Sequence, residues 1–480
     1  MRVLFLSSEV APWCRTGGLG DVAGALAATL GRLDPTLEIA VVVPLYRAVR
    51  RTVEQRRTAL EATGIEADLE SFDTAGSFLA APAAGPVRTY FLDAPDLYDR
   101  DGLYGHPDDA RRFGALAWSA LQAAPRLLGG EPDVLHAHDW QTALAPVYAA
   151  TRLRSRLPDL RSVFTVHNLA YHGSFDKKAL PGLGLPWSLF VPEALEFWDR
   201  VCFLKGGIVF ADTVTTVSPS YAKEIATPAH GHGLDGLLRA HTKKLHGILN
   251  GIDTQLWDPE TDAFLPAHYS FDDLDGKPRC RAALLAELGL EAAHDHPLCA
   301  AIARLTTQKG LDQVAELVPR LRELGARLVV LANGDIDLER RFEALAAAHP
   351  TELAVRIRFD EALSHRITAG ADLLLMPSRW EPCGLSQMYA MAYGTLPVVH
   401  ASGGLIDTVV DAGTRPRPRA GATGWHFSPV SAEALFSTLQ RAVGVFRHDP
   451  GSWRRMQRAA MTLDFGWDTA ARTYLGLYAR

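Results

Sequence analysis

The sequence predicts an α/β protein made of two Rossmann-like domains, each with a doubly wound parallel sheet. Short apolar runs alternate with longer helical stretches along the whole chain, and the runs fall into two sets. The chain has 480 residues, more than a single hydrophobic core usually serves. Together these observations favour two domains of the same architecture.

Each apolar run is expected to be a buried parallel strand, because both of its faces are apolar. The first set covers residues 3–8, 39–44, 133–139, 162–168 and 213–218. The second set covers residues 299–305, 327–335, 372–378 and 395–402. Segments with helical periodicity lie between the runs, among them 311–325 and 338–348.

The change from the first set to the second is expected near residues 247–262, where strand-like sequence gives way to a polar, proline-containing stretch. We therefore place one domain in residues 1–245 and the other in residues 246–460. Residues 411–424 alternate arginine with proline and are expected to form a long solvated loop.

Composition and charge argue against several classes of protein. Hydrophobic residues make up 48% and charged residues 22%, which is typical of a soluble globular protein. The net charge of -6 gives no reason to expect a nucleic-acid partner, and no apolar run is long enough to cross a bilayer. The N-terminus lacks the long apolar region of a signal peptide. Five scattered cysteines without a CxxC pair argue against disulfides or a zinc site, so we expect a cytoplasmic protein.

Two glycine-rich turns of the same pattern lie near opposite ends of the chain, GGLGD at residues 17–21 and GGLID at residues 403–407. Glycines before a helix let backbone N–H groups approach an anion. Arg15 would add a positive charge at the first turn. A tight turn without any ligand would use the same glycines, so the pattern alone leaves both interpretations open.

In an open α/β sheet, ligands bind beyond the carboxyl ends of the strands. His136 and His138 share one face of their strand and Asp139 lies on the other, since side chains alternate. No third ligand at a clear spacing supports a metal site, so a hydrogen-bonding cluster is the favoured interpretation. Asp139 beside Trp140 suits a sugar, because the ring can stack on a pyranose while the carboxylate accepts from hydroxyls. His167 follows the next strand in the same way.

Three charged side chains follow strands of the second domain. Arg304 and Lys309 flank a turn, where two cations can hold a diphosphate, although two solvated surface charges would give the same pattern. Glu381 precedes a Pro-Cys-Gly turn and a helix, where a carboxylate can orient sugar hydroxyls. Cys383 has no histidine near it in the sequence, so we expect a buried thiol rather than a nucleophile.

These motifs, taken in order, resemble those of the bacterial glycogen synthase and plant starch synthase family. The resemblance covers essentially the whole chain and includes TGGLGDV, HAHDWQTALAP, FTVHNLAYHG, HGILNGID, ARLTTQKGLD, PSRWEPCGLSQMYAMAYGTLPVV and DFGWDTAARTYLGLY. The family consists of retaining glucosyltransferases of the GT-B fold, in which two Rossmann-like domains face each other across a cleft. The resemblance also implies that a C-terminal helix, in residues 461–480, returns to the first domain.

The resemblance implies a role for each residue singled out above. Arg304 and Lys309 would hold the diphosphate of the donor and stabilise it as leaving group. Glu381 would orient the hydroxyls of the transferred glucose, His167 would lie beside that glucose, and Asp139 would lie near the reacting centre. The donor would also contact Arg15, Gly17, Gly18, Asp21, Asn250, Phe359, Cys383, Gly384, Gly403 and Gly404. Both glycine turns would thus close on one nucleotide sugar.

The implied reaction transfers glucose from ADP-glucose to the non-reducing 4-hydroxyl of an α-1,4-glucan such as glycogen, with retention. Its transition state should be oxocarbenium-like, and closure of the two domains should exclude water. We expect no covalent nucleophile. We also expect neither a metal nor another cofactor, because two cationic side chains and helix N-termini can stabilise the leaving group.

Three departures from the family pattern leave the choice between ADP-glucose and UDP-glucose open. Arg15 replaces lysine, Phe359 replaces tyrosine, and His400 with Ala401 replaces two arginines. Three alternative functions remain: a GT-B transferase with UDP-glucose or a small acceptor, a sugar-nucleotide epimerase, and a non-catalytic glucan-binding homologue. A phosphorylase is disfavoured, since the sequence shows no motif for a pyridoxal phosphate lysine.

Overall fold

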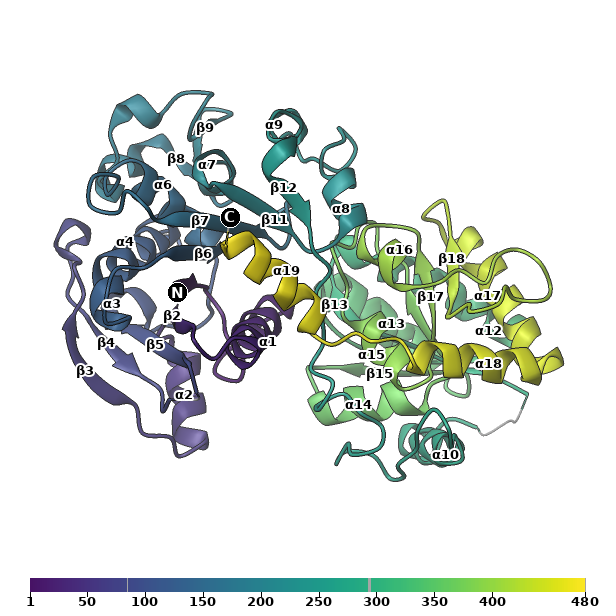
Figure 1. The fold of residues 1–480 in the computed structure, drawn as a ribbon. Coiled ribbons are helices and arrows are strands. Elements are labelled where there is room, and N and C mark those ends of the chain that lie inside the picture. Colours follow the sequence, from purple (N-terminus) through teal and green to yellow (C-terminus); the bar gives the residue numbers. More distant parts are fainter. Residues whose placement is uncertain (84, 292–294, 480) are drawn as a thin grey trace. The chain divides into compact units, whose positions relative to one another are not determined.

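The computed structural model describes residues 1–83, 85–291 and 295–479. The chain forms two compact α/β units (Figure 1). Unit 1 comprises Met1–Gly251 and Trp467–Arg480, and unit 2 comprises Ile252–Gly466. The boundaries expected from the sequence, after residues 245 and 460, lie slightly before these divisions.

Among the described residues, unit 1 is built on a nine-stranded sheet with the order β12-β11-β7-β6-β1-β2-β5-β4-β3. The strands from β12 to β5 in this order are parallel, and they are β1 (Arg2–Leu6), β2 (Glu38–Pro44), β5 (Val87–Asp93), β6 (Val134–His138), β7 (Arg161–Val166), β11 (Thr213–Thr216) and β12 (Leu245–Gly247). At one edge the antiparallel hairpin of β3 (Glu61–Glu66) and β4 (Ser77–Ala80) extends the sheet. The first set of predicted strands is confirmed as β1, β2, β6, β7 and β11. Strand β3 escaped prediction because it is largely exposed and has no apolar run.

A small antiparallel sheet with the order β8-β10-β9 also belongs to unit 1. Its strands are β8 (Ser174–Asp176), β9 (Glu196–Phe197) and β10 (Arg200–Cys202). Two residues, Trp198 and Asp199, join β9 to β10 as a tight hairpin.

Helices flank the large sheet of unit 1 (Figure 1) and include α1 (Gly18–Leu33), α4 (Asp109–Leu127), α6 (Leu144–Ala150), α7 (Phe203–Phe210) and α19 (Asp468–Tyr478). Helix α1 buries Val22, Leu26 and Leu30, which recur at helical spacing. The C-terminal helix α19 packs against α1, and the hydroxyl of Tyr478 lies 2.6 Å from His136 Nδ1 in the middle of the sheet.

The sheet of unit 2 is parallel and has the order β15-β14-β13-β16-β17-β18. Its strands are β13 (Leu298–Leu305), β14 (Arg327–Gly334), β15 (Leu353–Ile357), β16 (Leu373–Met376), β17 (Leu396–His400) and β18 (Trp425–Phe427). The second set of predicted strands is confirmed as β13, β14, β16 and β17. Two predominantly parallel sheets with flanking helices thus bear out the predicted α/β fold class.

The longer helices of unit 2 are α10 (Gly276–Leu288), α13 (Ile336–Ala348), α14 (Glu361–Gly370), α17 (Ala432–His448) and α18 (Pro450–Met461). The helical segment expected at 311–325 is divided into α11 (Leu311–Leu317), a 3₁₀ turn and α12 (Leu321–Leu324). Pro319 explains the division, because it has no N–H to donate to the preceding turn. Residues 411–424 form the expected loop before β18.

No helix in the described ranges is both long and apolar enough to cross a membrane. All five cysteines are buried, and none of them forms a disulfide.

Candidate functional site

In each unit the strand order changes direction next to the first strand. Strand β1 has β2 on one side and β6 on the other, and β13 has β14 on one side and β16 on the other. Open α/β sheets form ligand sites beyond the carboxyl ends of the strands at such points. Asp139 follows β6, Arg304 and Lys309 lie at the end of β13 and just after it, and Glu381 follows β16, whereas His167 follows the neighbouring strand β7.

The loop after β1 is anchored by Glu9, a buried carboxylate that the sequence analysis did not identify. Glu9 accepts hydrogen bonds from the backbone N–H and the hydroxyl of Thr16, and from the hydroxyl of Tyr104, 2.6 Å away. A polar residue directly after a buried strand was the signal that could have found it. In the same loop, Arg15 Nη1 lies 2.9 Å from Asp21 Oδ1. The two residues, both predicted to contact the nucleotide sugar, therefore form an ion pair with each other.

Each of the two glycine turns lies at the start of a helix. Gly17 precedes α1, which begins at Gly18, and Gly403 precedes α16 (Gly404–Thr408). Gly403 has a φ of +47°, which other residues rarely adopt, whereas Gly17 is extended. A Cβ on Gly404 would lie 2.3 Å from the carbonyl oxygen of Cys383, so this glycine is required for close backbone approach.

Asp139 lies at the carboxyl end of β6 with a φ of +56°, a left-handed conformation. Its Oδ1 accepts hydrogen bonds from the backbone N–H groups of His167, at 2.7 Å, and Asn168, at 3.4 Å. Burial raises the pKa of Asp139 to about 7, and the two hydrogen bonds oppose this rise because they favour the carboxylate. Asp139 can therefore change its protonation state near neutral pH.

A pair of histidines lies beside Asp139. His138 Nδ1 is 3.0 Å from His167 Nε2, so one ring donates a hydrogen bond to the other. Burial lowers the pKa of His167 to about 3 and that of His138 well below its usual range, so both rings are neutral at physiological pH. His136, on the same strand face, bonds Tyr478 and Thr165 and so serves packing. The described residues contain no group of three side chains that could hold a metal ion.

In unit 2 a partly buried ion pair joins the segments that follow β13 and β16. Lys309 Nζ donates to Glu381 Oε2 at 2.6 Å, and Ser378 Oγ donates to the same oxygen at 2.8 Å. Glu381 is only 4% exposed, whereas Arg304, at the end of β13, is exposed. His400 Nδ1 donates to the carbonyl oxygen of Ser378 at 2.8 Å, so this departure from the family pattern supports the Glu381 loop.

The turn that follows Glu381 is packed against the second glycine turn. The backbone N–H of Gly404 donates to the carbonyl oxygen of Glu381 at 3.1 Å. Gln387 Nε2 donates to the carbonyl oxygens of Cys383 and Gly384, which closes the turn. The thiol of Cys383 is buried as expected. Four predicted positions, Glu381, Cys383, Gly384 and Gly404, are therefore held together in one pair of packed turns.

Two predicted donor contacts stand apart from these clusters. Phe359 follows β15 and is 75% exposed, so its ring is open to a stacking partner. Asn250 is buried in the segment after β12. Within the described part of the chain, neither side chain forms a hydrogen bond with the other predicted site residues.

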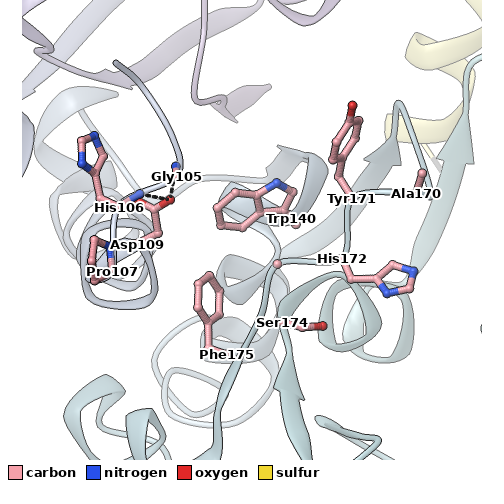
Figure 2. Close-up of a pocket in the computed structure, with 11 residues that line it drawn as sticks. Gly105, His106, Pro107, Asp109, Trp140, Ala170, Tyr171, His172, Ser174 and Phe175 are labelled. Carbon is pink, nitrogen blue, oxygen red and sulfur yellow. Dashed lines mark hydrogen bonds between the residues drawn. The ribbon is translucent and has the colours of Figure 1, made fainter. Parts of the chain in front are cut away.

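A cavity of about 610 Å³ in unit 1 adjoins Asp139 through the next residue, Trp140. Figure 2 shows the Trp140 ring between the loop that carries His106 and the loop that carries Tyr171. The walls of the cavity also include Asp109, His172 and Phe175. Trp140 packs so closely on Gly173 that a Cβ atom on residue 173 would clash with the indole ring. Flat rings together with polar side chains suit a polyhydroxylated ligand. Only Trp140 of these residues was singled out from the sequence, because the others come together through tertiary contacts.

Comparison with known proteins identifies relatives over the whole chain. The family model for the starch synthase catalytic domain matches residues 2–240, and that for glycosyl transferases group 1 matches residues 289–444. Glycogen synthase from Anaeromyxobacter dehalogenans is 46% identical, with 100% of this chain and 99% of the relative covered. Glycogen synthase from Yersinia pseudotuberculosis is 44% identical, with both chains fully covered.

Solved structures give a consistent result. The catalytic domain of starch synthase IV from Arabidopsis thaliana, bound to ADP and acarbose, matches with a TM-score of 0.90 at 34% identity, covering 100% of this chain and 98% of that one. Sucrose-phosphate synthase from Thermosynechococcus elongatus matches with a TM-score of 0.60 at 18% identity, covering 100% and 98%, and shows a shared fold alone.

Proposed function

This chain belongs to the bacterial glycogen synthase and plant starch synthase family of glucosyltransferases, and we propose that it elongates an α-1,4-glucan with glucose from ADP-glucose, with retention. The acceptor is the 4-hydroxyl at the non-reducing end. The observation that carries the proposal is the Lys309–Glu381 pair at the direction change of the unit 2 sheet, just beyond β13, the strand that carries Arg304. The ADP bound to the Arabidopsis relative supports an adenine nucleotide. Five cysteines that form no disulfide support action in the cytoplasm.

In this proposal Arg304 and Lys309 hold the donor diphosphate. Negative charge grows on the departing phosphate oxygen as its bond to the anomeric carbon breaks. Two positioned cations stabilise that charge more in the transition state than in the ground state. Glu381, fixed by Lys309 and Ser378, accepts hydrogen bonds from the glucose hydroxyls.

His167 and Asp139 are assigned to the sugar that is transferred. The neutral ring of His167 can donate to a glucose hydroxyl without adding a positive charge beside an oxocarbenium-like centre. Asp139 can accept from a sugar hydroxyl while its other contacts hold the loop. We assign no covalent nucleophile, and the leaving phosphate takes the proton of the acceptor hydroxyl on the same face of the ring.

The Trp140 cavity is proposed to receive the non-reducing end of the glucan. Its aromatic walls can stack on glucose rings, and Asp109, Ser174 and His172 offer polar atoms for hydroxyls. Arg15, Asp21 and Asn250 in unit 1 and Phe359 in unit 2 are proposed as further contacts of the donor.

Nucleotide release by the purified protein with glycogen as primer tests the proposal. ADP-glucose and UDP-glucose are compared, primer is omitted in controls, and the product is digested with an enzyme specific for α-1,4 linkages. Primer-dependent ADP release with a digestible product is expected. Release from UDP-glucose alone would overturn the donor, and release without primer would indicate a small acceptor. Conversion of the donor sugar without transfer would indicate an epimerase, and no turnover of either donor would favour a non-catalytic homologue.

A further inference from the structure

Trp198 is the most exposed large hydrophobic residue in the described part of the chain, with 80% of its surface open to solvent. It lies at the tip of the β9–β10 hairpin of unit 1. Its neighbours Asp199 and Arg200 are exposed and charged, so the indole does not belong to a wider apolar surface. The fold therefore presents the Trp198 ring to solvent beside charged side chains.

The backbone under this ring is strained. Trp198 has a φ of +52° and Asp199 a φ of +59°, a region that favours glycine and asparagine in two-residue hairpin turns. Glu196 Oε1 accepts the backbone N–H of Asp199 at 2.8 Å, and Lys177 Nζ binds the Asp199 carboxylate at 2.6 Å. The buried Lys205 ammonium donates to the carbonyl oxygen of Glu196. The left-handed backbone of this turn is thus held in place by hydrogen bonds and an ion pair from neighbouring residues. Strained backbone that is held in this way is found preferentially at functional sites.

A cavity of about 650 Å³ adjoins the indole and is lined by Glu196, Phe197, Trp198, Asp199 and Lys205. It combines flat aromatic rings with carboxylates at its edge. The C–H groups on a face of glucose pack on such rings, and the hydroxyls around the sugar donate to such carboxylates. A stable protein partner would instead bury about 800 Å² on this side, a much wider contact than a single two-residue turn offers.

This second cavity is connected to the first by aromatic contacts. The Phe197 ring, in the wall of the second cavity, lies edge-on to the His172 ring at 5.4 Å, and His172 lines the Trp140 cavity. Phe197 in turn contacts the Trp198 ring at 6.0 Å, so a band of rings (His172, Phe197 and Trp198) leads from the wall of the Trp140 cavity to the hairpin tip. A long chain that enters the first cavity can extend along this band.

We propose that the Trp198 hairpin is a second binding site for an α-1,4-glucan chain and holds a part of the acceptor several glucose units away from the reacting end. The inference rests on the proposed function, because it takes the acceptor of that reaction as its ligand. Trp198 contributes binding rather than catalysis. Its loss should therefore weaken binding of long glucans and leave transfer to short acceptors unchanged.

The test compares the full-length protein with Trp198→Ala and with Phe271→Ala, a control that removes an exposed aromatic ring of unit 2. Co-sedimentation with glycogen measures binding without any donor, and initial rates with glycogen and with maltotetraose measure transfer. We expect Trp198→Ala to weaken glycogen binding about three- to ten-fold and raise the KM for glycogen to match. Its kcat and its rates with maltotetraose should equal those of the wild type. Trp198→Tyr should recover most of the binding.

The outcomes separate the two proposals. Wild-type glycogen binding by Trp198→Ala would overturn the second site and leave the proposed function intact. An equal loss of maltotetraose activity would also overturn it, because the residue would then act at the reacting end. A third outcome is that the wild type turns over no donor, but Trp198→Ala still binds glycogen more weakly than the wild type does. That outcome would overturn the proposed function and retain the second site. If Phe271→Ala weakened glycogen binding as much as Trp198→Ala, any exposed aromatic ring would contribute to glycogen binding. That result would contradict the proposal.

Discussion

Lys309 Nζ lies 2.6 Å from Glu381 Oε2, so the cation proposed to hold the diphosphate is paired with the carboxylate proposed to orient the sugar. The two residues follow adjacent strands of the unit 2 sheet. We therefore expect binding of the diphosphate at Lys309 to affect binding of the sugar hydroxyls at Glu381, because the two side chains form an ion pair.

Lys309→Ala and Glu381→Ala should each lower kcat by about 10²–10³-fold, because each removes a group positioned for the transition state. The double variant should be little slower than either single one, since paired residues act as a unit. The kcat of each variant is measured from initial rates with saturating donor and saturating glycogen. Arg322→Ala, which breaks the surface pair with Glu352 in the same unit, is the matched control and should keep wild-type activity. Multiplicative losses in the double variant would contradict the coupling.

Asp139→Asn should make the stability of the protein less dependent on pH. Burial raises the pKa of Asp139 to about 7, so the folded protein holds a proton there that the unfolded chain has already lost above about pH 4. Stability from this group is present in acid and is lost as pH rises toward 7. The variant should therefore gain several degrees in melting temperature relative to wild type at pH 8 and less at pH 5. The same difference at both pH values would contradict the raised pKa.

Phe359→Ala should raise the KM for the nucleotide sugar about ten-fold, because the exposed ring is expected to stack on the base. The KM for glycogen and the melting temperature should not change, since the ring is 75% exposed. Phe359→Tyr tests the family pattern directly and should bind the donor at least as well as wild type. An unchanged donor KM in Phe359→Ala would remove this residue from the site.

Tyr478→Phe should destabilise unit 1 without affecting chemistry. It removes the hydroxyl that bonds the buried His136 and leaves that nitrogen without its partner, at a cost of about 1–3 kcal/mol. We expect a lower melting temperature and a normal kcat at low temperature. Tyr171→Phe, on an exposed ring, provides the comparison and should melt as wild type does.

Several elements of the fold followed from the sequence, and others did not. Most of the parallel strands were predicted because a buried strand is apolar on both faces, as in β2 and β14. The parallel strands β5, β12, β15 and β18 were not identified. The hairpin of β3 and β4 was not, because its exposed residues resemble loop sequence. The division of α11 from α12 was overlooked although Pro319 marks it.

The sequence by itself determined which residues stand at the carboxyl ends of strands, because apolar runs and the polar residue after each run are local features. Asp139, His167, Arg304 and Glu381 were found in this way. The tertiary structure decided which polar side chains contact one another. Glu9 bonds Tyr104, and Lys309 bonds Glu381, across 95 and 72 positions of sequence respectively. It also decided the raised pKa of Asp139, since burial and electric field depend on everything packed around a group and not on its neighbours in the chain.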